Sequence, residues 1–319
     1  MKVLVTGGAG FIGSNVCREL LSKSEVDEVR VLDDFSTGFV ENLADQDVKI
    51  VEGSILDPKA LDRAAASCSA ILHLAAVPSV PRSIADPLRS HDANATGTLR
   101  VLEAARQNEN AHVVLASSSS VYGANSTLPK TEDLQCLPMS PYAVSKLATE
   151  SYAMAYAKCY GLPVLPFRFF NVFGPGQAAG HAYAAVVPAL IDAALGGRCL
   201  PIDGDGHQSR DFTYVGTVAA VLARAIVGRV TSSPTNLAFG TRTTVNELVE
   251  LLERVMGQDL QVEHREPRPG DVPHSQASDT KLRELFPDVV PTDLETGLIH
   301  TVSWLRGLKN RSSASANDR

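Results

Sequence analysis

The sequence lacks the features that mark several classes of protein. No cluster of Lys and Arg stands out along its 319 residues, and the formal net charge is −7. A nucleic-acid backbone needs clustered cations, so no nucleic acid is expected as a partner, although a phosphorylated small molecule needs only a few. No apolar run is long enough to span a bilayer, and no internal repeat is present. The sequence therefore predicts a globular protein without a membrane partner.

Cysteine is scarce and scattered. The five cysteines form no C-x-x-C pair, and their number is odd. This pattern predicts reduced, mostly buried thiols and a reducing, cytoplasmic location, with no metal site. Met1 leads directly into a strand-like run, so no signal peptide is expected before it.

The first half of the chain alternates strand-like and helical runs. The expected strands are 2–6, 28–32, 48–52, 70–74, 112–116 and 163–168. Helices are expected between them, including 11–22, 99–107 and 141–160. Apolar strands in such alternation predict a parallel sheet covered on both faces, which is the α/β, doubly wound Rossmann-type architecture.

After about residue 170 Gly and Pro become frequent and the alternation weakens. We predict a dinucleotide-binding domain over 1–170 and a smaller α/β substrate lobe over 171–307, with 212–226 returning to the first domain. An amphipathic helix is expected at 244–256, capped by Thr244 or Asn246. The polar residues 308–319 are expected to be disordered.

Three glycines at spacing three, Gly7, Gly10 and Gly13, lie between the first expected strand and helix. A tight turn there needs glycine backbone angles, and a diphosphate can approach only where no Cβ blocks it. The helix N-terminus then offers free N–H groups to the phosphates. Asp33 follows at the end of the second strand, where an acid binds ribose hydroxyls and repels a 2′-phosphate, so NAD is favoured over NADP. Asp34 could share that role, and the alternative is a glycine-rich turn with a surface acid.

Tyr142 and Lys146 are spaced i, i+4 near the start of a predicted helix, which puts both on one face. An adjacent ammonium and a positive nicotinamide ring lower the pKa of a phenol, which makes Tyr142 a candidate general base. The alternative is an ordinary surface pair. The hydroxyls of Ser117–Ser120 directly follow an apolar strand and are therefore expected at the sheet edge where such folds bind ligands. Ser118 is placed to hydrogen-bond the hydroxyl that Tyr142 deprotonates.

Together these residues resemble the extended short-chain dehydrogenase/reductase family, and within it the UDP-sugar 4-epimerases. The likeness covers about residues 1 to 305. Its shared motifs are Thr6-Gly-Gly-Ala-Gly-Phe-Ile-Gly13, His73-Leu-Ala-Ala76 and Tyr142-x-x-x-Lys146. More discriminating motifs are Arg168-Phe-Phe-Asn-Val-Phe-Gly174, Gly204-Asp-Gly206, Ser209-Arg-Asp-Phe212 and Arg268-Pro-Gly-Asp-Val-Pro-His-Ser275.

The resemblance implies a set of site residues. The implied catalytic residues are Ser118, Tyr142 and Lys146. The implied NAD-binding residues are Gly7, Gly10, Phe11, Ile12, Gly13, Asp33, Asp34, Ser36, Thr37, Gly38, Ser54, Ile55, Leu74, Ala75, Ala76, Tyr142 and Lys146. The implied substrate-binding residues are Ser79, Ser118, Ser119, Ser120, Tyr142, Asn171, Gln177, Val187, Arg210, Arg268, Asp271 and Ser275. Among these, Asn171, Arg210 and Arg268 would hold the UDP diphosphate and Asp271 the uridine ribose.

The resemblance also narrows the reaction. Sugar 4,6-dehydratases of the family carry an Asp–Glu pair where this chain has Ser119 and Ser120, so elimination is disfavoured. C4 epimerisation of a UDP-hexose through a 4-keto sugar is expected. A UDP-glucuronate decarboxylase is the nearest competitor, and a non-catalytic NAD-binding protein is a further alternative.

The sugar preference depends on the small Ser275, which leaves space for an N-acetyl group, and on Gln177. UDP-GlcNAc and UDP-GalNAc are expected, with UDP-Glc and UDP-Gal also accepted because pocket size discriminates weakly. A C6 carboxylate could meet the hydroxyls of Ser119 and Ser120, which keeps UDP-glucuronate and UDP-N-acetylglucosaminuronate 4-epimerases open. Ser54 departs from the aspartate that usually grips the adenine amine, and a lysine seen near Pro78 in some relatives is absent. Relatives often form homodimers through the helices at 96–107 and 141–160.

Overall fold

The computed structural model describes residues 1–179, 184–266 and 272–317. Its centre is a seven-stranded sheet in which all the pairings are parallel. In spatial order the strands are β11 (Thr235–Leu237), β6 (Val164–Phe169), β5 (His112–Ser118), β4 (Ala70–His73), β1 (Lys2–Thr6), β2 (Glu28–Asp33) and β3 (Lys49–Glu52). The predicted Rossmann-type architecture is confirmed, and six of the strands lie where the sequence predicted them.

The strand order reverses at β1. Thr6 at the end of β1 is in register with Leu32 of β2 on one side and with His73 of β4 on the other. The chain leaves the sheet in opposite directions on the two sides of such a point, and ligands bind in the crevice outside the carboxyl ends of the strands. The topology therefore places the loops after β1, β2, β3 and β4 around one site.

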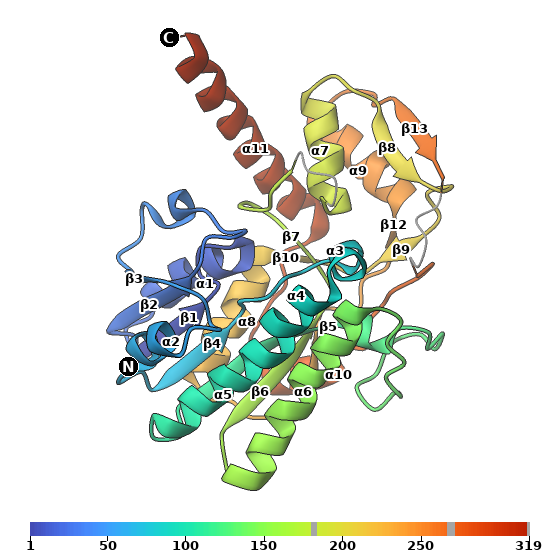
Figure 1. Ribbon diagram of the computed structural model, residues 1–319. Coiled ribbons are helices and arrows are strands. Elements are labelled where there is room, and N and C mark those ends of the chain that lie inside the picture. Colours follow the sequence, from blue (N-terminus) through green and yellow to red (C-terminus); the bar gives the residue numbers. More distant parts are fainter. Residues whose placement is uncertain (180–183, 267–271, 318–319) are drawn as a thin grey trace.

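Helices cover both faces of the sheet (Figure 1). One hydrophobic cluster joins the sheet to α1 (Phe11–Leu21), α8 (Val215–Val227) and α10 (Thr280–Leu285). A second cluster joins the opposite face to α2 (Pro58–Ala65), α5 (Gly97–Gln107) and α6 (Pro141–Tyr160). Shorter elements precede α5 or lie in loops: η1 (Val40–Leu43), α3 (Val80–Ala85), α4 (Pro87–His91), η2 (Asp92–Thr96) and η3 (Ser119–Tyr122).

Helix α6 begins and ends where the predicted helix does, because the local signals are strong. The Ser140 hydroxyl accepts a hydrogen bond from the Ala143 amide at 3.1 Å, and Pro141 occupies the first turn. Gly161 ends the helix in the left-handed conformation, with φ +66°. In the second lobe, Thr244 caps α9 (Val245–Met256) through a reciprocal capping box with Glu247, which decides between the two predicted caps.

The second lobe packs α7 (Val186–Leu195), α9 and part of α11 (Leu294–Asn317) around its own hydrophobic cluster. Its strands form small two-stranded sheets: β8 (Leu200–Asp203) with β13 (Val262–Arg265), β9 (Ser209–Arg210) with β12 (Thr243–Thr244), and β7 (Asn171–Phe173) with β10 (Phe212–Tyr214). Within the segment 212–226 that was predicted to return to the first domain, α8 packs against α1, whereas β10 pairs with β7 outside the main sheet. The return is larger than predicted, because β11 and α10 also join the first domain.

The C-terminal part differs from expectation in one respect. The sequence predicted disorder from residue 308, and α11 instead continues to Asn317, projecting beyond the body of the molecule (Figure 1). Within the described residues, no helix is long and apolar enough to cross a membrane. All five cysteines are free thiols, but only Cys17 and Cys68 are buried, so the expectation of mostly buried thiols was too broad.

Candidate active site

The glycine loop between β1 and α1 is packed too closely for side chains. Gly7 has φ +72°, and a Cβ there would lie 2.7 Å from the Ala75 amide nitrogen in the loop after β4. A Cβ on Gly13 would lie 2.2 Å from the Gly7 carbonyl oxygen. Gly10 caps α1 without a side-chain hydrogen bond, so the first N–H groups of this helix face the loop. The geometry is that of a cradle for a diphosphate at a helix N-terminus.

Asp33 ends β2 beside this cradle. One carboxylate oxygen accepts a hydrogen bond from the Ala9 amide at 2.9 Å, and the other accepts one from the Phe35 amide, also at 2.9 Å. Burial raises the pKa of Asp33, and these two amides act in the opposite direction. Asp34 accepts hydrogen bonds from the amide and hydroxyl of Ser36, which fixes the loop that follows. Two carboxylates therefore lie in fixed positions at the strand end.

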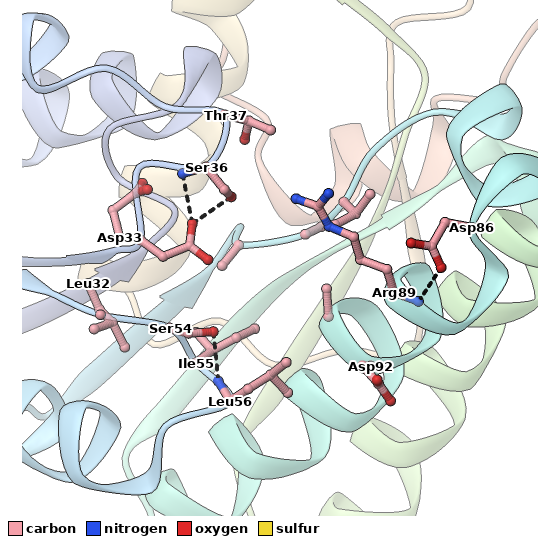
Figure 2. Close-up of a pocket in the computed structure, with 16 residues that line it drawn as sticks. Leu32, Asp33, Ser36, Thr37, Ser54, Ile55, Leu56, Asp86, Arg89 and Asp92 are labelled. Carbon is pink, nitrogen blue, oxygen red and sulfur yellow. Dashed lines mark hydrogen bonds between the residues drawn. The ribbon is translucent and has the colours of Figure 1, made fainter.

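A cavity of about 370 Å³ opens next to these carboxylates (Figure 2). The predicted cofactor-binding residues that line it are Asp33, Asp34, Ser36, Thr37, Ser54, Ile55, Ala75 and Ala76. The other predicted ones in these loops, Gly7, Gly10, Phe11, Ile12, Gly13, Gly38 and Leu74, do not line it. Gly38 packs against the glycine loop, since a Cβ there would lie 2.8 Å from the carbonyl carbon of Ala9. The lining also includes Asp86, Arg89 and Asp92, which sequence reasoning missed.

The predicted catalytic residues meet at the carboxyl end of β5. Ser118 is the last residue of this strand, and its hydroxyl lowers the pKa of the Tyr142 phenol. The Ser118 oxygen also accepts hydrogen bonds from the Ser120 amide at 3.2 Å and the Ser120 hydroxyl at 2.9 Å. The Lys146 ammonium, one turn along α6 from Tyr142, donates to the Ala116 carbonyl of β5 at 2.9 Å. Tyr142 and Lys146 thus both face the strand end.

Burial opposes the charged forms of both side chains at this point. It raises the pKa of the Tyr142 phenol, which the Ser118 hydroxyl lowers in part. Burial also lowers the pKa of Lys146 to about 8. The predicted lowering of the phenol pKa depended on the nicotinamide ring as well as on the ammonium, so it stays a prediction for the cofactor-bound protein.

Several predicted substrate-binding residues lie on or beside the short strands β7 and β9 of the second lobe. Asn171 begins β7, and its amide donates to the Asp211 carbonyl at 3.1 Å. On β9, Arg210 donates to the carbonyl oxygens of Ser209 and Pro273, at 2.9 and 3.3 Å. The buried Ser275 donates its amide to the Ser209 carbonyl at 3.0 Å. The structure therefore brings Arg210 and Ser275 together around Ser209.

The remaining predicted substrate residues are more dispersed. Ser79 has φ +99° and uses its hydroxyl to cap α3. Gln177 donates its side-chain nitrogen to the Val172 carbonyl at 3.1 Å, and its side-chain oxygen is buried without a hydrogen-bond partner among the described residues. Val187 is buried in the core of the second lobe, so only its backbone at the start of α7 is placed for a ligand. The predicted Arg268 and Asp271 lie outside the described residues.

Comparison with known proteins identifies the family of this chain. Residues 3–236 match the NAD dependent epimerase/dehydratase family. The chain belongs to this family. It is 36% identical over 312 residues to a UDP-glucose 4-epimerase of Mycolicibacterium smegmatis, covering 96% of this chain and 99% of that protein.

Two solved structures are similar along nearly their whole length. A UDP-N-acetylglucosamine 4-epimerase from Methanobrevibacter ruminantium M1, in complex with UDP-N-acetylmuramic acid, is 36% identical with a TM-score of 0.90, over 96% of this chain and 98% of that one. A UDP-glucose 4-epimerase from Thermotoga maritima, with UDP-glucose, is 35% identical with a TM-score of 0.90, over 97% and 99%. The likeness to the extended short-chain dehydrogenase/reductase family and to UDP-sugar 4-epimerases is thereby confirmed.

The residues present fit the NAD of this family. The glycine loop leaves backbone rather than side chains at the place where a diphosphate approaches, and an added Cβ at Gly7 or Gly13 would block it. Asp33 stands at the end of β2, where a carboxylate binds ribose hydroxyls. NAD is the cofactor of this epimerase/dehydratase family member, as the sequence predicted.

A buried ion pair that sequence reasoning missed lies directly behind the catalytic residues. Arg168 on β6 donates to both carboxylate oxygens of Glu150 on α6, each at 2.9 Å. The Ser117 hydroxyl, next to Ser118, donates to the same carboxylate at 2.5 Å. The sequence did contain a signal, because Glu150 follows Lys146 by one helical turn and Arg168 begins a family motif. The pair fixes α6 against β5 and β6 at the level of the site.

A second buried network connects the glycine loop to α6. His73 at the end of β4 is hydrogen-bonded to the hydroxyls of Thr6, at 2.8 Å, and Thr98, at 3.0 Å. Thr98 contacts the Thr149 hydroxyl of α6 at 3.2 Å. Burial, and to a smaller extent the positive charge of Lys146, lower the pKa of His73 to about 3, so this ring is neutral at physiological pH.

Proposed function

We propose that the protein catalyses NAD-dependent C4 epimerisation of a UDP-hexose through a transient 4-keto sugar. The preferred pair is UDP-GlcNAc and UDP-GalNAc, with UDP-Glc and UDP-Gal also accepted. The observation that carries this proposal is the meeting of Ser118, Tyr142 and Lys146 at the end of β5, beside the cofactor cradle. Membership of an epimerase/dehydratase family and the similarity to UDP-sugar 4-epimerases support it.

The protein's own residues handle the proton. Tyr142 takes the proton from the C4 hydroxyl, and Ser118, whose hydroxyl lowers the pKa of the phenol, orients that hydroxyl. Lys146, held by the Ala116 carbonyl, supplies positive charge near the phenolate that forms. NAD, when bound, accepts a hydride from C4 and returns it. Between the two transfers the 4-keto sugar turns its other face, and Tyr142 gives the proton back.

The site lacks the groups that other reactions of this fold need. Elimination across C5 and C6 needs an acid and a base near those carbons, and Ser119 and Ser120 of η3 offer only hydroxyls. Loss of a carboxylate group would usually need an acid beside Ser118 as well. The side chains at this strand end therefore favour epimerisation over dehydration and decarboxylation.

The substrate must be gripped at its nucleotide end and held loosely at its sugar. In this proposal Arg210 on β9 and Asn171 on β7 bind the diphosphate together with Arg268, and Asp271 binds the uridine ribose. At the sugar end, the buried side-chain oxygen of Gln177 has no partner in the described part of the chain, and it can accept a hydrogen bond from a sugar hydroxyl or an acetamido N–H. The small side chain at Ser275 supports acceptance of an N-acetyl group.

A substrate panel followed by NMR tests the proposal. The chain is incubated with UDP-GlcNAc, UDP-Glc, UDP-glucuronate and UDP-N-acetylglucosaminuronate, without added NADH. The expected product is the C4 epimer, formed fastest from UDP-GlcNAc. Conversion of a uronate alone would identify a uronate epimerase, and release of CO2 would identify a decarboxylase. NAD binding without turnover on any of these sugars would contradict an enzymatic role.

Tyr142→Phe provides the decisive variant. Removing the phenolic oxygen removes the proton acceptor, so turnover should fall by more than about a hundredfold. NAD affinity and the thermal midpoint should change little by comparison, which separates lost chemistry from lost folding. Near-normal epimerase activity in this variant would refute the assignment. A homodimer built on α5 and α6 and a cytoplasmic location stay predictions.

A further inference from the structure

We propose that Arg89 of α4 is a cofactor-binding residue whose guanidinium covers the adenine ring of NAD. The proposal depends on NAD as the cofactor and on the place of its adenosine half. It does not depend on the proposed epimerisation. Arg89 belongs to none of the motifs that carry the family resemblance.

The cavity beside Asp33 fits the adenosine half by its place in the fold. Its walls come from the ends of β2, β3 and β4 and from α4 and the start of η2. It therefore lies at the carboxyl edge of the sheet, on the side of β1 where the acid that binds ribose stands. Its volume of about 370 Å³ is within the range of small-molecule sites.

Arg89 is the single basic side chain among the residues that line this cavity. Four carboxylates line it as well, those of Asp33, Asp34, Asp86 and Asp92. Figure 2 shows the Arg89 side chain extending from α4 into the cavity, with its guanidinium turned away from Asp86. Asp86 instead accepts a hydrogen bond from the backbone amide of Arg89 at 3.0 Å and caps the helix. Across the described parts of the chain, the Arg89 guanidinium forms no ion pair.

At Ser54 the opposite wall presents a hydroxyl rather than a carboxylate to the edge of adenine. That hydroxyl accepts a hydrogen bond from the Leu56 amide at 3.2 Å. Ile55 next to it is buried against the hydrophobic cluster of this face. A base that is held weakly at its edge can be held by its face, and a guanidinium stacks well on an aromatic plane. Arg89 is the side chain placed to do so.

Direct binding measurements test this inference without any turnover assay. The full chain is cleared of bound nucleotide, and NAD is titrated calorimetrically into wild type, Arg89→Ala and Arg89→Lys. We expect Arg89→Ala to weaken NAD binding about tenfold, which is within the range of cation–π contacts. Arg89→Lys should weaken it nearly as much, because lysine keeps the charge but loses the plane. Arg100→Ala, an exposed arginine on α5 outside the cavity, is the matched control and should leave the affinity unchanged.

Competition with adenosine and with AMP separates the adenine from its phosphate. If Arg89 covers the base, Arg89→Ala should weaken both competitors by the same factor. A loss for AMP without a loss for adenosine would place the guanidinium on the phosphate and overturn the inference, as would equal NAD affinity in Arg89→Ala and wild type. Failure of the wild-type chain to bind NAD would instead refute the cofactor itself, which distinguishes the two failures.

Discussion

Replacing Arg168 with methionine tests how the catalytic helix is held against the sheet. The Arg168 and Glu150 side chains are 6% and 4% exposed, and two hydrogen bonds of 2.9 Å join them. Removing one partner of such a pair leaves a buried charge without compensation, which costs about 3–5 kcal/mol. Methionine has a similar length and no charge, so the change removes the interaction with little change in volume.

Because the guanidinium makes several further contacts, we expect the loss in the free energy of unfolding to lie in the upper half of that range. Arg168 also donates to the Tyr122 hydroxyl at 3.0 Å, the Glu132 carbonyl at 3.2 Å and the Cys136 sulfur at 3.4 Å. It lies 4.8 Å from the centre of the Tyr122 ring. An unfolding entropy of about 2.1 cal/mol/K per residue gives roughly 0.7 kcal/mol/K for this chain, so the melting temperature should fall by about 6–7 °C.

Urea unfolding followed by circular dichroism measures the effect, with Arg106→Met as the control. Arg106 pairs with Glu103 on the exposed side of α5, where the side chains are 38% and 34% exposed, so its loss should cost less than about 1 kcal/mol. A double variant, Arg168→Met with Glu150→Leu, removes the orphan carboxylate and should recover part of the loss. The reasoning fails if Arg168→Met costs no more than the control, or if the double variant loses the sum of the two single changes.

Three further predictions follow from the glycine loop, the buried histidine and the buried lysine. Gly13→Ala brings a Cβ to 2.2 Å from the Gly7 carbonyl, so calorimetry should show NAD affinity reduced at least tenfold. Burial lowers the pKa of His73 to about 3, so between pH 6.5 and 3 the unfolded chain binds a proton that the native chain does not. The free energy of unfolding should therefore decrease as the pH is lowered through this range, by up to about 1.4 kcal/mol per pH unit. The decrease should be less steep in His73→Gln. Burial lowers the pKa of Lys146 to about 8, which shows that the protein interior disfavours its charged form. Lys146→Met removes this buried charge, so thermal unfolding should show that the free energy of unfolding rises by about 1–3 kcal/mol while epimerisation is lost. A less stable Lys146→Met chain would show that the bond to the Ala116 carbonyl outweighs desolvation.

The parts of the fold that were predictable are those with local signals. The strands from β1 to β6 are short runs rich in Val, Ile, Leu and Phe, and the bounds of α6 follow from Ser140, Pro141 and Gly161. The glycine loop and Asp33 could be found because the loop lies between the first strand and the first helix, and Asp33 lies at the end of the second strand. The candidate catalytic residues were predicted to converge because the carboxyl ends of parallel strands share an edge, and Ser118 acts on the pKa of Tyr142 there.

The parts that were not predictable depend on contacts between distant segments. β11 has three residues and α10 has six, and each joins the first domain only because the chain returns from the second lobe. Such short runs carry no periodicity that assigns them to one sheet or another. Arg89 lines the cavity beside Asp33 because α4 forms part of its wall, which no spacing within the sequence indicates.

The prediction about Tyr142 depends on a positive charge that only the bound cofactor supplies. In the protein by itself, burial opposes the charged forms of both Tyr142 and Lys146, which are packed against β5, and the Ser118 hydroxyl lowers the phenol pKa only in part. The predicted lowering of the phenol pKa needed the positive nicotinamide ring as well as the ammonium of Lys146. We therefore predict that Tyr142 acts as a base only beside the oxidised cofactor, which would tie proton removal from C4 to the presence of a hydride acceptor.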